Sequence, residues 1–211
     1  TFSTSVFIAP TALTSWVVGF RPAHGTHDVT DFLRLAAAKA AEWRQPLGAL
    51  PLDVAAAFDH MDIRQCTKEL PRVGAPWSLT TAWAREQTGV RLHPRVAGVE
   101  ADVIDMEKGM RPGARATPDV WNVQLDRLTE QFYNRWSGHA VGWSESISAF
   151  PLHWYADNAI LVSDHRLTLM EMAADLETAI RVIALHFVAS PLELVGNACL
   201  IYTYTSTRDS N

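Results

Sequence analysis

The chain has 211 residues, of which 48% are hydrophobic and 19% are charged, a balance typical of one sizeable, folded, soluble domain. Such a composition excludes long disordered or low-complexity segments. The net charge of -5 argues against a protein that holds nucleic acid by bulk charge, because phosphate binding normally leaves a basic surface.

The usage of cysteine and histidine argues against zinc and disulfide chemistry. Cys66 and Cys199 lie far apart without ligand spacing, which predicts neither kind of site and fits a reducing compartment. His153 is interpreted as an ordinary strand residue rather than a ligand. No run of about eighteen apolar residues occurs, so no membrane span is expected. Residues 1–10 lack a basic leader and an initiator methionine, and we expect a piece of a longer intracellular protein, nuclear or cytoplasmic.

The first quarter of the chain predicts a helix followed by a strand. Residues 1–27 mix β-branched residues with prolines and glycines, which indicates irregular structure or short strands. Apolar residues at helical spacing predict a helix over 31–43, and the turn residues that follow end it. Residues 50–54 predict a short strand that ends near Asp53. Pro51 lacks an amide donor and must lie where the strand has no partner for it.

The middle of the chain predicts short helices, a hairpin and a long helix. Residues 62–70 and 78–87 suit two helices, the second capped by Ser78. Residues 90–96 and 101–106 flank Gly98 and predict a hairpin, which leads into a loop over 108–113. A helix then begins with Thr117 as its cap and Pro118 in its first turn. Its predicted apolar face comprises Trp121, Leu125, Leu128 and Phe132.

The last third of the chain predicts a second hairpin and an amphipathic helix. Residues 149–155 and 159–163 are apolar and rich in aromatics, and they are joined across the acidic turn Ala156-Asp157-Asn158. The tail after Thr203 is polar and is expected to fray. The helix carries apolar residues every three to four positions, at Leu169, Met172, Leu176, Ile180, Ile183 and Phe187.

The two aspartates at strand ends, Asp53 and Asp157, are weak signals when taken alone, because turns favour Asp and Asn for local reasons. Their surroundings are more specific. Residues 52–59, Leu-Asp-Val-Ala-Ala-Ala-Phe-Asp, resemble the first catalytic motif of the reverse transcriptase domain of non-LTR (LINE-like) retrotransposons, commonly Leu-Asp-x-x-x-Ala-Phe-Asp. Residues 154–158, Trp-Tyr-Ala-Asp-Asn, resemble the Tyr-Ala-Asp-Asp turn of the same family.

Further motifs of that family occur in the same order, and the resemblance runs from Gly19 to about Glu193. The segment 19–26 resembles the family's Gly-Phe-Arg-rich entry to the palm. Residues 107–113, followed by Thr117-Pro118 and Trp121-Asn122, resemble its Gly-x-x-Gln-Gly, Ser-Pro and Phe-Asn series.

The resemblance implies an α+β fold, the right-hand polymerase palm, with an antiparallel sheet covered by helices on one face. Part of the fingers is expected and the thumb is expected to be absent. The implied boundaries are residues 1–47 for partial fingers and the entry to the palm, 48–193 for the palm, and 194–211 for a C-terminal tail.

The resemblance also implies template-directed DNA synthesis by two-metal nucleotidyl transfer. The partners would be an RNA template, a DNA primer and deoxynucleoside triphosphates, and the cofactor two Mg²⁺ ions, with Mn²⁺ as a substitute. Hard cations take oxygen ligands, so Asp53 and Asp157 are the implied catalytic carboxylates and Asn158 is a neutral metal ligand beside them.

Several residues have a substrate role by resemblance and an ordinary structural role as the alternative. Phe58 would be the aromatic gate that excludes a 2′-hydroxyl, or a core residue. Gly113 would let the backbone approach the nucleotide, or serve a turn. Arg21 and Arg111 would contact phosphate or template, or remain solvated. Asp59 is interpreted as a turn or capping residue rather than a ligand.

Three departures from the family's pattern predict impaired activity. Asn158 replaces a second aspartate and brings no charge. Pro112 replaces a glutamine and removes both a side-chain amide and a backbone donor. No lysine follows Ala184-Leu185. The main interpretation is therefore an impaired polymerase domain, or a fragment, from a retroelement polyprotein, and the oligomeric state is left open.

Two other interpretations stay open at this point. The first is a catalytically dead palm that acts as a nucleic-acid or protein-binding scaffold. The second is an unrelated α+β domain whose turn aspartates lie far apart. The distance between Asp53 and Asp157 in space separates a palm from an unrelated domain. Residues about a hundred positions apart do not become neighbours by local rules, so adjacent aspartates favour a palm and distant ones an unrelated domain.

Overall fold

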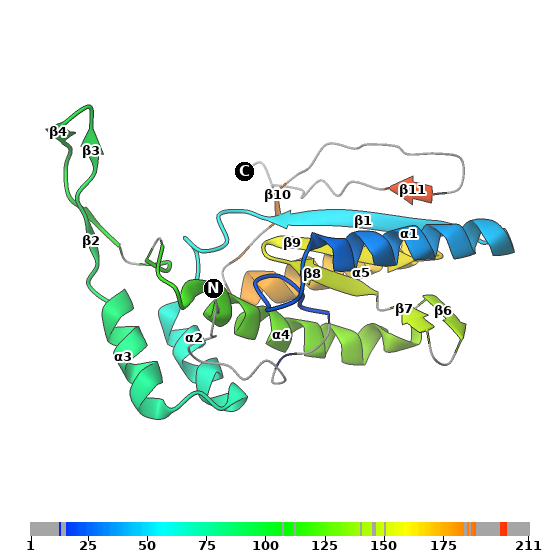
Figure 1. The fold of residues 1–211 in the computed structure, drawn as a ribbon, viewed down its shortest axis with the longest axis horizontal. Coiled ribbons are helices and arrows are strands. Elements are labelled where there is room, and N and C mark those ends of the chain that lie inside the picture. Colours follow the sequence, from blue (N-terminus) through cyan, green and yellow to red (C-terminus); the bar gives the residue numbers. More distant parts are fainter. Residues whose placement is uncertain are drawn as a thin grey trace.

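Strand β1 (Leu47–Val54) forms the middle of the main sheet in the computed structural model of the chain (Figure 1). The structure describes residues 13, 16–106, 108–111, 113–139, 141–144, 147–149, 151–183, 185, 187–188 and 199–201. The sheet order is β10 (Phe187–Val188), β1, β9 (Asn158–Ser163) and β8 (Leu152–Tyr155), and all three pairings are antiparallel. A further strand, β11 (Cys199–Ile201), pairs with β1 in parallel.

Strand β1 begins three residues before the predicted start, and its pairing accommodates Pro51. The amide of Val54 donates to the Asp157 carbonyl at the β9 side, at 3.0 Å. Because amides alternate along a strand, the nitrogen of Pro51 points to the opposite edge. The described partners on that edge, β11 and β10, pair with residues 47–49 and 53–54 and skip position 51. Pro51 therefore lies where no described strand offers a carbonyl to a backbone amide, so its missing N–H costs the described sheet no hydrogen bond.

One face of the sheet forms the main core with two long helices, α4 (Thr117–Trp136) and α5 (Arg166–Val182). Alternate residues of each strand point to this face, and the helices present apolar stripes toward it. Two shorter helices, α2 (Ile63–Glu69) and α3 (Trp77–Gln87), extend the helical layer, joined by a 3-10 turn over Leu70–Val73. The fully buried members of this core include Leu50, Trp121, Leu125, Trp154, Leu161, Leu169, Met172 and Leu176.

The other face of the sheet is covered in part by α1 (Thr26–Trp43), which packs on Leu47 and Val162 in a second, smaller cluster (Figure 1). The predicted α+β class, with an antiparallel sheet and covering helices, is confirmed. The structure adds α1 on the second face, where the sequence predicted helices on one face alone. The ring of Phe32 in α1 lies against the ring of His153 in β8, with centroids 4.2 Å apart.

A long arm projects from the body between α3 and α4 (Figure 1). It consists of β2 (Arg91–Leu92) paired with β5 (Ile104–Asp105), and β3 (Arg95–Val96) paired with β4 (Val99–Glu100). The hairpin predicted around Gly98, which has φ +83°, is therefore confirmed, although its strands are shorter than predicted. Strand β6 (Val141–Ser144) pairs in antiparallel fashion with β7 (Ile147–Ala149), and a 3-10 turn covers Ser137–His139. No helix in the described part of the chain is both long and apolar enough to cross a membrane.

Two of the predicted helix caps are wrong. Pro76 has extended dihedral angles and directly precedes α3, so Ser78 lies inside the helix rather than at its N-cap. Ala116 is the N-cap of α4, and Thr117 is its first residue, followed by Pro118 in the first turn as predicted.

Two of the predicted helix ends also differ. Helix α1 starts at Thr26, five residues early, because the carboxylate of Asp28 accepts the Gly25 amide at 2.7 Å and completes the first turn. That bond also lowers the pKa of Asp28. Helix α5 ends at Val182, and Phe187 belongs to β10 although its spacing continues the helical stripe.

Candidate active site

The sheet register brings the two predicted catalytic aspartates together. Asp53 in β1 lies directly opposite Asn158, the first residue of β9, and Asp157 immediately precedes Asn158. The bond from the Val54 amide to the Asp157 carbonyl fixes this end of the pairing. An unrelated domain with distant turn aspartates is therefore excluded.

The pair carries concentrated negative charge at the end of the sheet. Burial raises the pKa of Asp53, and the neighbouring charge of Asp157 raises it further. Among the described residues, no group of three or more His, Cys, Asp or Glu side chains converges to hold a metal ion. A cation held at this pair would take its remaining ligands from nucleotide oxygens, water and the neutral side chain of Asn158.

The acidic turn is a two-residue connection, Ala156-Asp157, between the paired residues Tyr155 and Asn158. Ala156 has φ +55°, a left-handed conformation that turns of this length usually give to glycine. The Asn158 side chain is exposed, and its amide donates to the Asp157 carboxylate at 3.2 Å. Asn158 therefore occupies one carboxylate oxygen of its neighbour in addition to lacking a charge of its own.

Two other segments, residues 16–19 and the start of α4, hold this turn in place. The chain over 16–18 runs beside β8, with hydrogen bonds between Val18 and Trp154 and between Trp154 and Trp16. Gly19 follows, and a Cβ atom at this glycine would lie 2.3 Å from the Ala156 nitrogen, so only glycine permits the approach. From α4, the indole of Trp121 donates to the Ala156 carbonyl at 2.8 Å, and Asn122 donates to the Gly19 carbonyl at 2.7 Å.

The loop after Asp53 places Phe58 in an aromatic cluster. Its ring is half-buried and lies 6.4 Å from the ring of Phe20 and 5.6 Å from that of Trp121, the latter in an edge-on arrangement. Asp59 is exposed, and its amide donates to the Ala56 carbonyl, which is the turn role predicted for it. Phe58 packs in part against the core while its other side stays accessible.

The loop over 108–113 pairs with the loop that follows Asp53. The Gly109 amide donates to the Met61 carbonyl at 3.0 Å, and the Met110 amide donates to the Phe58 carbonyl at 2.8 Å. Gly109 has φ +85°, and a Cβ atom there would lie 2.6 Å from the Asp59 oxygen. Glycine is therefore required at position 109 for two reasons, the positive φ angle and the close approach of the Asp59 backbone.

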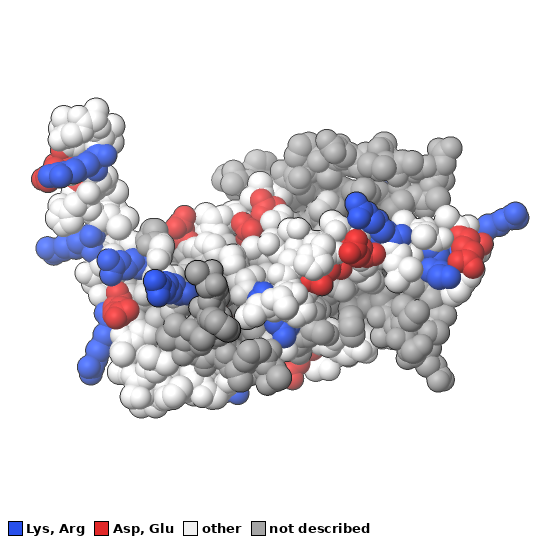
Figure 2. All heavy atoms as spheres, viewed as in Figure 1, with Lys and Arg blue, Asp and Glu red and all other residues white. Residues whose placement is uncertain are grey.

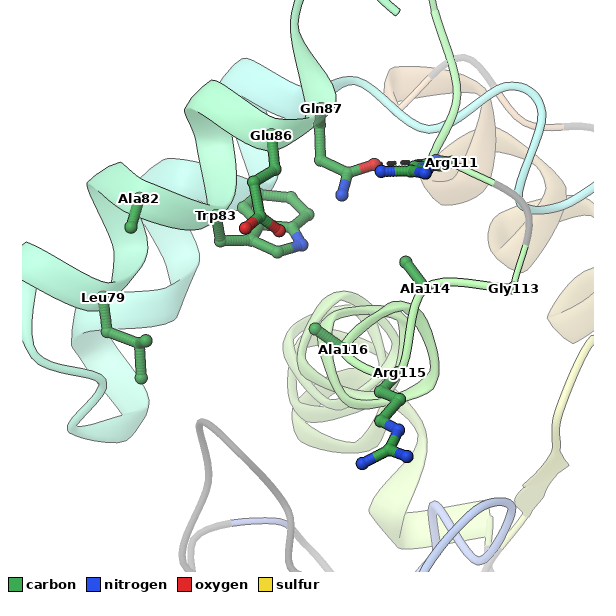
Figure 3. A pocket seen from close by; sticks show the side chains of 10 residues that line it. All are labelled: Leu79, Ala82, Trp83, Glu86, Gln87, Arg111, Gly113, Ala114, Arg115 and Ala116. Carbon is green, nitrogen blue, oxygen red and sulfur yellow. Dashed lines mark hydrogen bonds between the residues drawn. The ribbon is translucent and has the colours of Figure 1, made fainter. Parts of the chain in front are cut away.

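A pocket of about 420 Å³ opens between α3 and the start of α4 (Figure 3). Gln87, buried at the end of α3, accepts the Arg111 amide at 2.7 Å, and Figure 3 shows these two residues facing each other at one side of the pocket. Gly113 lines the pocket with φ +76° and has open space around its Cβ position, so its dihedral angle alone favours glycine. Pro112 lies outside the described residues.

The two arginines predicted to contact substrate differ in their surroundings. Arg111 is exposed and lines the pocket. Arg21 is half-buried, and its guanidinium donates to the Val17 carbonyl at 3.1 Å, which ties it to the segment beside β8. Arg111 is thus the better placed of the two for a ligand.

Charge is distributed unevenly over the molecule. Figure 2 shows acidic side chains over the end of β1 and the loop that follows it, and basic side chains on the arm. The basic side chains on the arm include Arg91 and Arg95, each paired with an acid across the strands.

Comparison with known proteins bears on this arrangement. A family model described as reverse transcriptase (RNA-dependent DNA polymerase) matches residues 5–190. The chain belongs to the reverse transcriptase family. None of the curated proteins compared with the chain matches it.

One of the solved structures similar to this chain is a telomerase. The apo telomerase from Candida tropicalis, truncated from its C-terminal domain, has 11% sequence identity and a TM-score of 0.45. The match covers 77% of this chain and 32% of the telomerase chain, so this chain spans about a third of its length.

Sequence reasoning missed two residues that shape this candidate site. Gln87 was assigned to a covering helix, and nothing in the sequence indicated that its amide would hold the loop at Arg111. Gly109 was assigned to a loop without a specific need for glycine. The paired glycines of the 107–113 motif were the available signal, because a motif with two fixed glycines indicates two backbone constraints.

Substitution of Gly109 tests the contact between the two loops. Gly109→Ala and Gly113→Ala both place a Cβ at positive φ, which costs roughly 1 kcal/mol. Only Gly109→Ala adds the clash with Asp59. We expect the free energy of unfolding, measured in urea, to fall by about 2 kcal/mol more for Gly109→Ala than for Gly113→Ala. Equal losses would contradict the close approach.

The raised pKa of Asp53 predicts a pH dependence of stability. Above pH 3.8, the ordinary value, and up to the raised pKa, the folded protein binds more protons than the unfolded chain, so the free energy of unfolding falls as pH rises through that window. Asp53→Asn removes the buried charge that lowers the free energy of unfolding, and it should therefore stabilise the metal-free protein at neutral pH.

Urea unfolding at pH 7 and at a pH below 3.8 measures this effect. The advantage of Asp53→Asn over the wild type should disappear at the lower pH, where both states of the wild type carry a protonated Asp53. Asp31→Asn, an exposed position on α1, is the control for loss of a surface charge. A variant less stable than the wild type at pH 7 would contradict a raised pKa of Asp53 caused by burial and by the charge of Asp157.

Proposed function

We propose that this chain is the catalytic palm of a retroelement reverse transcriptase and that Asp53 and Asp157 are its metal-binding carboxylates. The observation that carries the proposal is the register of β1 and β9, which sets Asp53 opposite the residue that follows Asp157. The order of the motifs from Gly19 to the acidic turn supports a non-LTR, LINE-like subtype. An RNA template, a DNA primer and deoxynucleoside triphosphates are the corresponding substrates.

The donor set fits a pair of Mg²⁺ ions. Asp53 and Asp157 provide oxygen ligands at the open end of the sheet. Burial, and then the charge of Asp157, raise the pKa of Asp53, and a bound cation would stabilise the ionised carboxylates against both effects. Asn158 adds a carbonyl oxygen on the same face. When bound, such ions lower the pKa of a primer 3′-hydroxyl and stabilise the charge of the leaving pyrophosphate.

The protein's own contribution is to position the reactants. Asp53 is held in the sheet, and Asp157 lies in a tight turn whose carbonyl accepts the Val54 amide of β1, which suits a reaction that depends on alignment. Phe58 lies five residues after Asp53, in the loop next to the carboxylates, where it would meet the sugar of the nucleotide. Arg111 and Gly113, at the pocket, would contact the nucleotide or template.

One observation favours impaired chemistry, and with it the alternative of a scaffold that binds nucleic acid or protein without catalysis. The Asn158 amide donates to the Asp157 carboxylate, so the site has one charge fewer and one carboxylate oxygen already engaged. Metal affinity would be lower than with two adjacent aspartates. A polymerase with weak activity and a scaffold with none differ only in the size of this effect.

Primer extension on an RNA template tests the proposed function. In Mg²⁺ or Mn²⁺ we expect slow addition of deoxynucleotides by the wild type, and none by Asp53→Asn or Asp157→Asn, because each removes a carboxylate ligand. Asn158→Asp should increase the rate roughly 10-fold or more, since it restores a charged ligand beside Asp157.

Asp31→Asn on α1 is the control and should extend primers as the wild type does. Absence of extension by both the wild type and Asn158→Asp would sink the polymerase assignment. Binding of the primed template without metal dependence would then support the scaffold.

The sugar-gate role of Phe58 has its own readout. Phe58→Val shortens the side chain, and we expect the ratio of ribonucleotide to deoxynucleotide incorporation to rise by roughly 10-fold or more. Phe20→Leu removes part of the same aromatic cluster and should leave the ratio unchanged. A ratio that stays constant in Phe58→Val while the protein loses stability would assign Phe58 to packing alone.

A further inference from the structure

Trp121 contacts both segments that carry the candidate carboxylates. It lies in the first turns of α4 and is fully buried, with 0% of its surface exposed. Its indole Nε1–H donates to the Ala156 carbonyl at 2.8 Å, one residue before Asp157. Its ring meets the edge of Phe58, in the loop after Asp53, with centroids 5.6 Å apart and planes at 63°.

The turn that receives this bond is strained and needs external support. Ala156 adopts φ +55°, a conformation that disfavours residues with a Cβ. Gly19 closes on the Ala156 nitrogen from one side, and the indole of Trp121 reaches the Ala156 carbonyl. The peptide groups on both sides of the Ala156 Cα are thus constrained from outside the hairpin. A bond at this point affects Asp157 directly, because it fixes the peptide plane that precedes it.

The chemistry of the side chain matters as well as its volume. A phenylalanine ring would pack on Phe58 but has no N–H to donate. The hydrogen bond to the turn is therefore a property of the residue that this chain carries.

We propose that Trp121 is a positioning residue that holds the Ala156-Asp157 turn against β1 through its indole N–H, and thereby keeps Asp157 beside Asp53. The effect on catalysis rests on the proposed function, whereas the effect on the turn does not. The bond from the Val54 amide to the Asp157 carbonyl is the local reporter, because it exists only while the turn lies on β1.

Trp154 provides a matched control. It is also a fully buried tryptophan, on the core side of β8, and its Nε1 has no hydrogen-bond partner among the described residues. Trp154→Phe therefore makes the same change of volume in the same core without removing a bond to the acidic turn. Any effect of Trp121→Phe that Trp154→Phe shares is due to packing.

Amide hydrogen exchange of the full chain, followed residue by residue by NMR, measures the effect. We expect the Val54 amide to exchange roughly 10-fold faster in Trp121→Phe than in the wild type, the size of one lost hydrogen bond. The Val162 amide, bonded to the Pro151 carbonyl in the neighbouring strand pair, is the internal reference and should change little. In Trp154→Phe the two amides should keep their wild-type ratio.

An isosteric replacement covers the case in which Trp121→Phe fails to fold. Benzothienylalanine at position 121 keeps the two-ring shape and replaces the N–H by sulfur, and it should give the same selective change at Val54. A wild-type ratio of Val54 to Val162 exchange in this variant would overturn the proposal. So would an equal change in Trp154→Phe.

Mn²⁺ binding, followed by electron paramagnetic resonance, separates this proposal from the proposed function. If both hold, the wild type binds Mn²⁺ and the position-121 variants bind it about 10-fold to 100-fold more weakly. If the wild type binds no Mn²⁺ but Val54 exchange still responds to position 121, the metal site fails and the role of Trp121 in the turn stands. If Mn²⁺ binds equally to wild type and variants, the positioning role is overturned and the metal site stands.

Discussion

The antiparallel pairing of β1 with β9 is the interaction on which the rest of this structure depends. Side chains alternate between the faces of a strand, so a slip by one residue would turn Asp53 toward the core and Leu52 toward solvent. The apolar residues Leu50 and Leu161 are paired on the core side and fix the register against such a slip. The hydrophobic core therefore sets the position of the acidic pair, although none of its buried side chains is a candidate metal ligand.

The two faces of the sheet serve different purposes. One face is packed against α4 and α5 and holds the larger of the two clusters of buried apolar residues. On the other face, α1 covers the end near Leu47 and leaves the end near Asp53 accessible. A polar site on a sheet needs this arrangement, because charges that face a packed layer would lose their hydration.

The sequence predicted the elements of the site better than it predicted what holds them. The strand ending near Asp53 and the hairpin tipped by Asp157 follow from local patterns, and their adjacency was implied by motif order rather than by any local rule. Gln87, Gly109 and the indole of Trp121 act over long separations in the chain, and such contacts have no local signature. The boundaries of fingers, palm and tail remain predictions.

The predictions of the helix caps were wrong for a different physical reason. Ser78 and Thr117 are favourable caps by residue type, but the conformation of the residues before them makes Pro76 and Ala116 the N-caps instead. Pro76 holds an extended conformation one residue ahead of α3, and the turn over 114–116 delivers Ala116 to the start of α4. Cap preference is a small energy, and chain geometry set by neighbouring segments overrides it.

The contact at Gly109 gives the projecting arm a mechanical relation to the site. The chain returns from the arm at Asp105 and within a few residues reaches Gly109 and Met110, whose amides bond to the loop that follows Asp53. The base of the arm is therefore tied to the loop that carries Phe58, and this tie depends on one residue without a side chain.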